Sequence, residues 1–165
     1  MEIERKWLVE GWPSQLEAYQ VIEMAQGYLS TRPTVRIRSE KTGEETRYRL
    51  CFKGKPSQDG LMRPEIETDI DKDLFSQLEQ LIGQPLVQKE QRRYRLENGL
   101  VLEANWVDAH QPTAFFYAEV EFDTSEQAKE WQIPPQLADY LTQEVTGTPG
   151  QSMAAYWNET RKQVE

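Results

Sequence analysis

Polar and apolar residues alternate along most of this chain with a period of two. Successive side chains of a β-strand point to opposite faces, so this period predicts strands with one polar and one apolar face. Turn-forming residues separate the alternating segments, among them Lys41-Thr42-Gly43 and the Asn-Gly pair of Glu97-Asn98-Gly99. We predict eight strands, over residues 2–9, 20–29, 34–40, 45–53, 62–70, 86–97, 100–108 and 114–122.

Three short helices fit between and after these strands. Asp71 is a capping residue for a helix that ends at Gly83, and Thr124 opens a second helix that runs through Trp131. Residues 152–163 form a third, which would bury Met153, Tyr156 and Trp157. The apolar stripe of the first helix consists of Leu74, Phe75, Leu78, Leu81 and Ile82. Many strands with few helices predict a mainly-β α+β fold, an antiparallel barrel with helices packed outside.

Charged residues occupy the polar face of several strands at every second position. The inner face of a small barrel is usually filled by apolar side chains. Here the apolar residues of each strand lie on the face opposite the charged one, as expected if they pack outward against helices. One such strand is typical of a solvated surface, whereas five or six together predict charged faces that meet inside the barrel. The charged positions include Arg36, Arg38, Arg47, Arg49, Lys53, Glu65, Glu67, Asp69, Lys89, Arg93, Arg95, Glu119 and Glu121.

A charged lumen is stable only if its ions pair or bind ligands, because desolvating an unpaired ion costs several kcal/mol. Arginine forms bidentate hydrogen bonds with phosphate oxygens, and lysine adds a point charge. Glutamates repel a bare phosphate, so their presence requires a divalent cation between carboxylate and phosphate. The pattern therefore predicts a site for a metal ion together with a polyphosphate.

The first six residues, Met1-Glu2-Ile3-Glu4-Arg5-Lys6, repeat this arrangement within one strand. Glu2, Glu4 and Lys6 share one face of the strand. Two carboxylates beside an ammonium group suit a metal ion and an anion bound together. A solvated edge strand gives the same pattern, and only the charged faces of the later strands favour the first interpretation.

Composition limits the class of protein. The 165 residues favour a single domain over 1–165, with 151–165 mainly a C-terminal helix. Lys and Arg number 19 against 28 Asp and Glu, and the net charge of −9 argues against binding to DNA but not against a small polyanion. No segment resembles a signal peptide or a membrane helix. We expect a cytoplasmic protein that binds neither DNA nor membranes. Whether it forms a homodimer is left undecided by the sequence.

The chain has one cysteine, Cys51, and one histidine, His110. A single cysteine forbids an internal disulfide and fits a reducing compartment. Zinc sites built on histidine and cysteine are excluded, so carboxylates would have to hold a metal, which points to Mg²⁺ or Mn²⁺. We expect Cys51 to be an inert residue of the lumen wall.

These residues resemble the CYTH family, also called triphosphate tunnel metalloenzymes. The opening Glu2-Ile3-Glu4-Arg5-Lys6 is similar to the E-x-E-x-K motif of the family, which is weak evidence alone. Six further segments, in the family's order and within residues 1–147, make the resemblance specific. They are Gln26-Gly27-Tyr28-Leu29, Val35-Arg36-Ile37-Arg38, Leu50-Cys51-Phe52-Lys53-Gly54, Arg63-Pro64-Glu65-Ile66-Glu67, Glu119-Val120-Glu121-Phe122 and Glu144-Val145-Thr146.

The resemblance implies an eight-stranded antiparallel tunnel that hydrolyses or rearranges a triphosphate with Mg²⁺ or Mn²⁺. It implies Glu2, Glu4, Lys6 and Lys53 as catalytic residues. The implied phosphate-binding residues are Lys6, Arg36, Arg38, Lys53 and Lys89, with Arg93 added from its position on the same face. The implied metal ligands are Glu2, Glu4, Glu65, Glu67, Glu119 and Glu121. Such catalysis rests on positioning and on neutralisation of the transferring oxygens.

Three positions depart from the pattern of the family. Gln91 stands where the family usually has an arginine, although Arg93 lies on the same face. Asn105 stands where the family tends to have an aspartate. After Thr146 the usual basic residue is missing, and the next cation is Arg161. Each departure removes one charged contact.

We expect divalent-metal-dependent hydrolysis of a triphosphate in the barrel lumen. Inorganic tripolyphosphate is favoured because no tryptophan is placed to stack on a base: Trp7 is expected in the core, Trp106 pointing away from the lumen, and Trp131 and Trp157 on helices. The alternatives are adenylate cyclase activity, thiamine triphosphatase activity and a non-catalytic polyphosphate-binding module. An interaction domain without an anionic ligand is a further alternative.

Overall fold

The computed structural model describes residues 1–161, and its strands form one antiparallel sheet. The long strands follow the alternating segments of the sequence closely, since each has one face toward the lumen. The strands are β1 (Glu2–Val9), β2 (Gln20–Thr31), β3 (Thr34–Thr42), β4 (Glu45–Lys53), β5 (Met62–Arg63), β6 (Glu65–Ile70), β7 (Val87–Arg95), β8 (Val101–Val107), β9 (Phe115–Glu121) and β10 (Gln143–Glu144).

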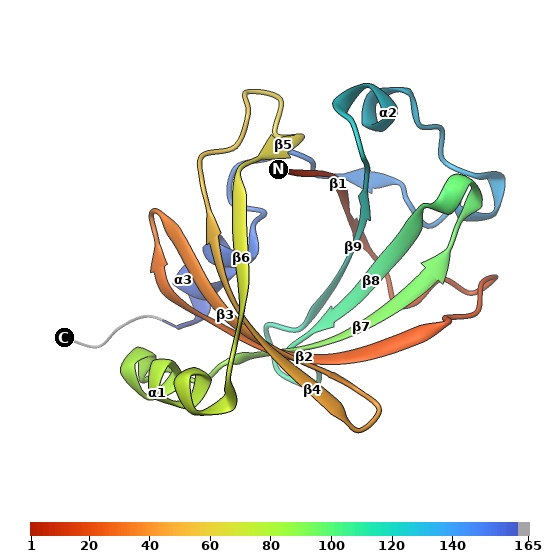
Figure 1. The fold of residues 1–165 in the computed structure, drawn as a ribbon. Helices are drawn as coiled ribbons and strands as arrows, with labels where there is room; N and C mark the ends of the chain where they lie inside the picture. Colours follow the sequence, from red (N-terminus) through yellow and green to blue (C-terminus); the bar gives the residue numbers. More distant parts are fainter. Residues whose placement is uncertain (162–165) are drawn as a thin grey trace.

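The sheet curls into a barrel that is hydrogen-bonded shut at one end. Its strand order is β10-β1-β9-β8-β7-β2-β3-β4-β6, and β5 pairs with β1 through the contacts Glu2↔Arg63 and Ile3↔Met62. In Figure 1, β5 and the start of β1 lie together at the top, and β6 and β9 diverge below them. The prediction of a mainly-β, antiparallel, tunnel-like barrel is confirmed.

The predicted number of eight strands is wrong, because the described part of the chain has ten. The predicted strand 62–70 is divided at Pro64, which has no N–H to give to a ladder. Its two parts have different partners, β5 pairing with β1 and β6 with β4. β10 has two residues and pairs with β1 at Trp7↔Glu144. A segment of that length has no visible period, so only tertiary pairing defines it.

The three predicted helices are present. They are α1 (Lys72–Ile82), α2 (Ser125–Glu130) and α3 (Met153–Thr160), with 3-10 turns η1 (Glu97–Gly99) and η2 (Pro135–Leu137). Asp71 caps α1 by accepting a hydrogen bond from the Leu74 N–H, and Gly83 ends it at φ +68°. The third helix was predicted over 152–163; α3 ends at Thr160, and residues 162 and 163 lie outside the described part. No helix in residues 1–161 is long and apolar enough to cross a membrane.

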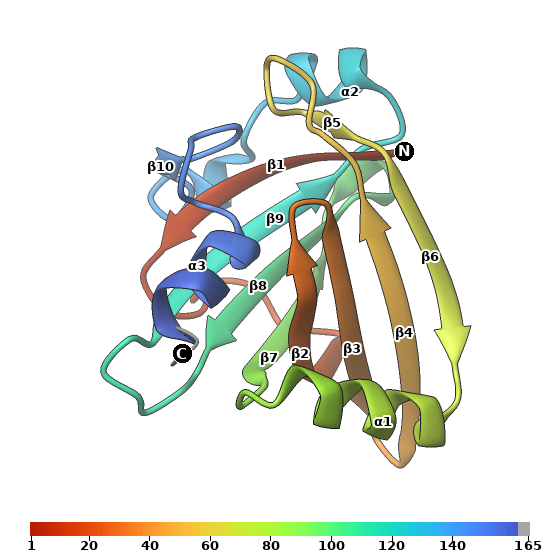
Figure 2. The same cartoon turned by 90° about the vertical axis from the view of Figure 1, so that its left-hand side faces the viewer.

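The apolar stripe of α1 is narrower than predicted. Phe75 is buried and packs in a cluster that includes Leu78 and Ile82, but Leu74 is 40% and Leu81 75% exposed. Figure 2 shows α1 lying across the ends of β2, β3 and β4, so only one side of the helix meets the sheet. Leu81 was therefore wrongly assigned to the buried face.

Much of the hydrophobic core lies outside the barrel wall. The outward faces of β1, β8 and β9 pack beneath α2 and the segment that follows it, with Trp7, Leu102 and Val120 almost fully buried against Leu137. Burying these side chains on the outside leaves the charged faces for the interior. The covering is incomplete over β4 and β6, where Phe52 is 40% and Ile66 70% exposed.

Candidate functional site

The interior of the barrel is a cavity of about 1170 Å³. Ten basic and eight acidic side chains line it, so basic groups outnumber acidic ones locally although the chain carries a net charge of −9. All the site residues predicted from the sequence line this one cavity. They are Glu2, Glu4, Lys6, Arg36, Arg38, Lys53, Glu65, Glu67, Lys89, Arg93, Glu119 and Glu121. Their chemical roles stay predictions.

A basic wall is formed where β3 pairs with β4. Arg36 is 7% exposed, and its guanidinium lies 3.6 Å from a carboxylate oxygen of Glu67. Arg49 lies closer to the same carboxylate, at 2.6 Å. Arg38 donates from Nε to the Gln26 side-chain oxygen at 3.2 Å. Within residues 1–161 the buried Nε of Arg36 has no hydrogen-bond partner. This wall therefore keeps donor capacity for an anion.

Lys53 extends the basic wall toward β1. Its ammonium group donates to both carboxylate oxygens of Glu2, at 3.0 and 3.1 Å. Burial opposes the ionisation of Glu2, but the Lys53 charge and a hydrogen bond from Glu65 outweigh it and lower the pKa of Glu2. This ion pair joins the start of β1 to the end of β4 across the lumen.

Two further lysines surround the ring of Tyr117. Lys89 donates to the Tyr117 hydroxyl at 2.8 Å, and the Lys6 ammonium lies 4.4 Å from the ring centroid and donates to the Gln151 carbonyl. Burial lowers the pKa of Lys6, and burial together with the Arg38 charge holds the pKa of Lys89 well below its usual range. An anion between these lysines would favour their charged forms.

An acidic cluster lies on β1 and β9. Carboxylate oxygens of Glu2, Glu4 and Glu121 lie within 4.8 Å of one another. Burial and the neighbouring Glu119 hold the pKa of Glu4 well above its usual range, and partial burial with Glu103 and Glu119 raises the pKa of Glu121 to about 7. Carboxylates this close repel one another unless a cation or a proton lies between them. Oxygen ligands in this arrangement fit Mg²⁺ or Mn²⁺.

A second group of possible ligands, Cys51, Glu65 and Glu67, fits a metal less well. Glu67 already receives Arg49 and Arg36, so its charge is compensated. Burial raises the pKa of the Cys51 thiol, which keeps it protonated. The acidic cluster, in which only Glu2 is paired with a cation among the described residues, is thus the better candidate. Glu67 lies beside Glu65 but among arginines, away from the predicted ligands on β1 and β9.

Arg93 lies near the edge of the basic surface. Its guanidinium is 3.5 Å from Glu103 and donates to the Tyr19 hydroxyl at 3.1 Å. Arg161 does not replace the cation missing after Thr146. It binds Asp108 at 2.7 Å, and neither residue lines the lumen.

The sequence prediction missed several residues of the cavity. Arg49 was expected on a lumen face but was given no role, and Tyr117 lies on the charged face of its strand, so the period of two was a sufficient signal for both. Gln151 contributes only a backbone carbonyl, supplied by the segment before α3. No sequence pattern marks such a contact.

Trp7, Trp106 and Trp157 lie where they were expected, whereas Trp131 follows the last residue of α2 in extended backbone rather than lying in the helix. Trp7 and Trp157 are buried in the core, and Trp106 stacks on Phe116 at a centroid distance of 5.3 Å, outside the lumen. The aromatic residues that do line the cavity are Tyr28 and Tyr117. Their hydroxyls bind Gln26 and Lys89.

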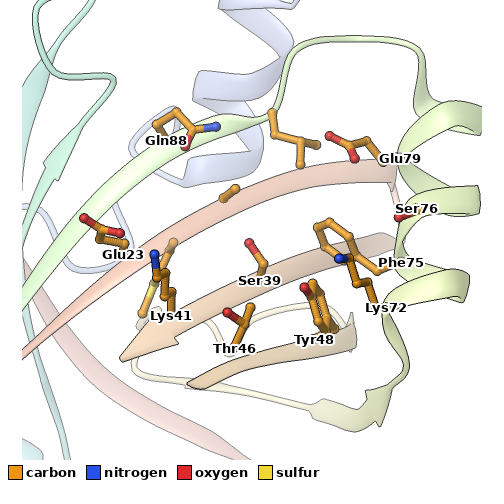
Figure 3. Close-up of a pocket in the computed structure, with 13 residues that line it drawn as sticks. Glu23, Ser39, Lys41, Thr46, Tyr48, Lys72, Phe75, Ser76, Glu79 and Gln88 are labelled. Carbon is orange, nitrogen blue, oxygen red and sulfur yellow. The ribbon is translucent and has the colours of Figure 1, made fainter. Parts of the chain in front are cut away.

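A second, smaller pocket of about 400 Å³ lies outside the barrel, between α1 and the strands (Figure 3). Lys72 and Glu79 come from the helix, and Glu23 and Lys41 come from the sheet. These opposite charges give no preference for an anion or a cation, and none of the predicted site residues is present. The lumen is therefore the candidate site.

No protein-family model and no curated protein sequence matches the chain. Solved structures do match. NE1496, described in one structure as a hypothetical protein and in another as an inorganic triphosphatase, is 27% identical; the two matches cover 94% of this chain and 97% and 93% of theirs, with TM-scores of 0.59 and 0.58. PH1819 from Pyrococcus horikoshii OT3 has a TM-score of 0.61 at 19% identity over 79% of this chain and 83% of its own.

HpAC1 from Hippeastrum, described as a candidate adenylyl cyclase with a dominant triphosphatase activity, matches at a TM-score of 0.53. It is 17% identical, over 78% of this chain and 83% of its own. With the charged lumen, these matches define a protein with a tunnel-like barrel fold. The chain has the CYTH or triphosphate tunnel fold, and the resemblance seen in the sequence is confirmed at the level of the fold.

Proposed function

We propose that this protein is a divalent-metal-dependent hydrolase of triphosphates and that inorganic tripolyphosphate is its substrate. One observation carries the proposal: a basic wall and the acidic cluster Glu2, Glu4 and Glu121 face the same cavity. An anion alone would not need the cluster, and a metal alone would not need the wall. The similarity to the inorganic triphosphatase NE1496, 27% identical over 94% of this chain, supports the same substrate class.

The basic residues bind and orient the phosphate oxygens. Arg36 and Arg38 supply guanidinium donors from β3, and Lys6 on β1 and Lys89 on β7 supply ammonium groups. Phosphoryl transfer depends mainly on such positioning and on neutralisation of charge. Mg²⁺ or Mn²⁺ held by the acidic cluster would polarise a phosphoryl oxygen and lower the pKa of the attacking water.

Glu119 is an ionised carboxylate beside the acidic cluster. Burial opposes its ionisation, but a hydrogen bond from Glu4 and the charges of Lys6 and Lys89 lower the pKa of Glu119. The carboxylate therefore stays ionised in the folded protein. Glu4, whose pKa is raised, holds the proton of the pair.

Phosphate release from tripolyphosphate, ATP and thiamine triphosphate tests the proposal, with Mg²⁺ and with Mn²⁺. We expect the fastest turnover with tripolyphosphate and complete loss of activity with EDTA. Cyclic AMP as the main product from ATP would identify a cyclase instead. Binding without cleavage would indicate a polyphosphate-binding module, and folded protein inactive on all three substrates contradicts the proposal.

A further inference from the structure

A pair of neutral amides interrupts the charged lumen. Gln91 on β7 pairs across the sheet with Asn105 on β8, and Gln91 donates from Nε2 to Asn105 Oδ1 at 3.0 Å. Gln91 is 5% exposed and lines the cavity, and Asn105 is fully buried behind it. Gln91 lies between Lys89 and Arg93 on one face of β7, and Glu103 precedes Asn105 on the same face of β8, so this neutral pair needs a physical account.

The hydrogen bonds fix the direction of both amides. Asn105 Nδ2 donates to the backbone carbonyls of Glu103 and Tyr117, at 3.3 and 3.4 Å. A rotated Asn105 would set its own oxygen against those two acceptors. Its Oδ1 must therefore face Gln91, which has to turn its amino group toward Asn105. The Gln91 Oε1 that remains has no hydrogen-bond partner in residues 1–161.

Gln91, whose unpaired oxygen is buried in the cavity wall, follows Lys89 along β7. Lys89 precedes Gln91 on the same face of β7, and Arg93 follows it. Lys89 is 4% exposed and makes no ion pair among the described residues, whereas Arg93 is compensated by Glu103. Beyond Lys89, this face of β7 thus offers the acceptor of Gln91 and then Arg93, a cation already paired with Glu103. Ionised phosphate oxygens are acceptors too, so Gln91 Oε1 opposes them.

We propose that Gln91 is a specificity-determining residue, and that because of it the phosphate-binding cations on β7 end at Lys89. A linear polyphosphate then cannot extend toward Arg93, and a longer chain has to continue in the opposite direction along the lumen. The inference rests on the proposed function for its substrate class. It adds which residue limits the bound chain and at which end.

The test compares, by titration calorimetry with Mg²⁺ present, the affinity for tripolyphosphate with that for tetrapolyphosphate, each added as a cleavage-resistant imido analogue so that no turnover occurs. Gln91→Lys replaces the acceptor with a cation, and we expect its affinity for tetrapolyphosphate to rise about tenfold, as for one added charge-assisted hydrogen bond. Its affinity for tripolyphosphate should change less than about threefold. Gln88→Lys places the same charge on the outer side of β7 and should leave the ratio of the two affinities unchanged.

Equal gains for both ligands, or no gain, in Gln91→Lys would overturn the inference. Should that variant fold poorly, Gln91→Met removes the acceptor without adding charge. An unchanged ratio of the affinities for tetrapolyphosphate and tripolyphosphate in Gln91→Met would also overturn the inference. If the unaltered protein cleaves tripolyphosphate but the Gln91 variants keep its ratio of the two affinities, only this inference is rejected and the proposed function stands. Binding of both ligands without cleavage rejects only the hydrolase proposal, and absence of binding to either rejects both.

Discussion

The groups in direct contact with the Lys6 ammonium are uncharged, and the charges of Glu119 and Glu4 act on it from beyond ion-pair distance. The ammonium group donates to the Gln151 carbonyl and lies over the Tyr117 ring, and no carboxylate forms an ion pair with it among residues 1–161. Burial lowers its pKa. A buried cation without an ion pair is costly unless a ligand compensates it, which is the physical basis for expecting phosphate there.

Lys6→Met should weaken the binding of tripolyphosphate. A hydrogen bond to a charged group contributes ~1.5–3 kcal/mol, so we expect KM to rise about tenfold or more. Lys72→Met, on α1 and outside the lumen, is the matched control and should behave as the unaltered protein. Equal KM values for the two variants would show that phosphate does not reach Lys6.

Glu121 should make metal binding depend on pH. Partial burial beside Glu103 and Glu119 raises its pKa from 4.5 to about 7. Its contribution to the free energy of unfolding is therefore complete below pH 4.5 and is lost as the pH rises through about 7. A divalent cation has to displace the proton of Glu121 below that pH, so Mg²⁺ should raise Tm more at pH 8 than at pH 6.

Thermal unfolding with and without Mg²⁺ at the two pH values measures this difference. Glu121→Gln cannot ionise, so the dependence on pH should become weaker in that variant. An increase in Tm that is the same at both pH values in the unaltered protein would mean that the cation binds elsewhere.

Most of the lumen residues were predictable, because a period of two assigns each side chain to a face without knowledge of the strand partners. Contacts were not predictable. Arg38 binds Gln26 because β2 and β3 pair in the register Gln26↔Arg38, and Gln91 binds Asn105 for the same kind of reason. Register depends on the whole sheet, so the sequence predicted which residues face the lumen but not what each one touches.

At the scale of elements, two loops meet beside the lumen through a pair of glycines. Gly60 precedes β5 and Gly147 follows β10, with φ values of +76° and +69°. A Cβ on Gly60 would lie 2.2 Å from the Gly147 Cα. Only two glycines permit this approach, which holds the segment before α3 against the cavity and so positions the carbonyl that Lys6 uses.

Gly60→Ala should destabilise the protein more than alanine does at another position with a positive φ. Strain at a positive φ costs about 1–3 kcal/mol, and here the clash with backbone adds to it. Gly99→Ala is the control, since Gly99 has φ +74° and no atom within 4 Å of the added Cβ. Chemical denaturation measures both free energies of unfolding, and equal losses would contradict the close approach of the two loops.

The missed elements were those that local sequence does not define. The division at Pro64 was visible in the sequence, but that its two sides pair with β1 and β4 was not. Leu81 fits the periodic stripe of α1 and is still 75% exposed, because the helix lies at the margin of the sheet. Periodicity gives the side of a helix that is apolar, whereas the width of its contact depends on where the helix docks.

At the scale of the whole molecule, the charge of the lumen differs from that of the chain. The chain carries a net charge of −9, and its lumen nevertheless has more basic than acidic side chains. The barrel brings residues from β1 to β9 into one cavity while the apolar faces pack outward. The fold class was predictable since that inversion of faces is visible along each strand; the closure through β5 was not, since it depends on two short pairings.

A crystal structure with Mn²⁺ and tripolyphosphate tests the central claim most directly. We predict an anomalous peak from manganese beside Glu2, Glu4 and Glu121, and a triphosphate along the wall formed by Arg36 and Arg38. Manganese among Cys51, Glu65 and Glu67 would contradict the assignment of the metal site. A triphosphate bound in the pocket under α1, with an empty lumen, would contradict the account as a whole.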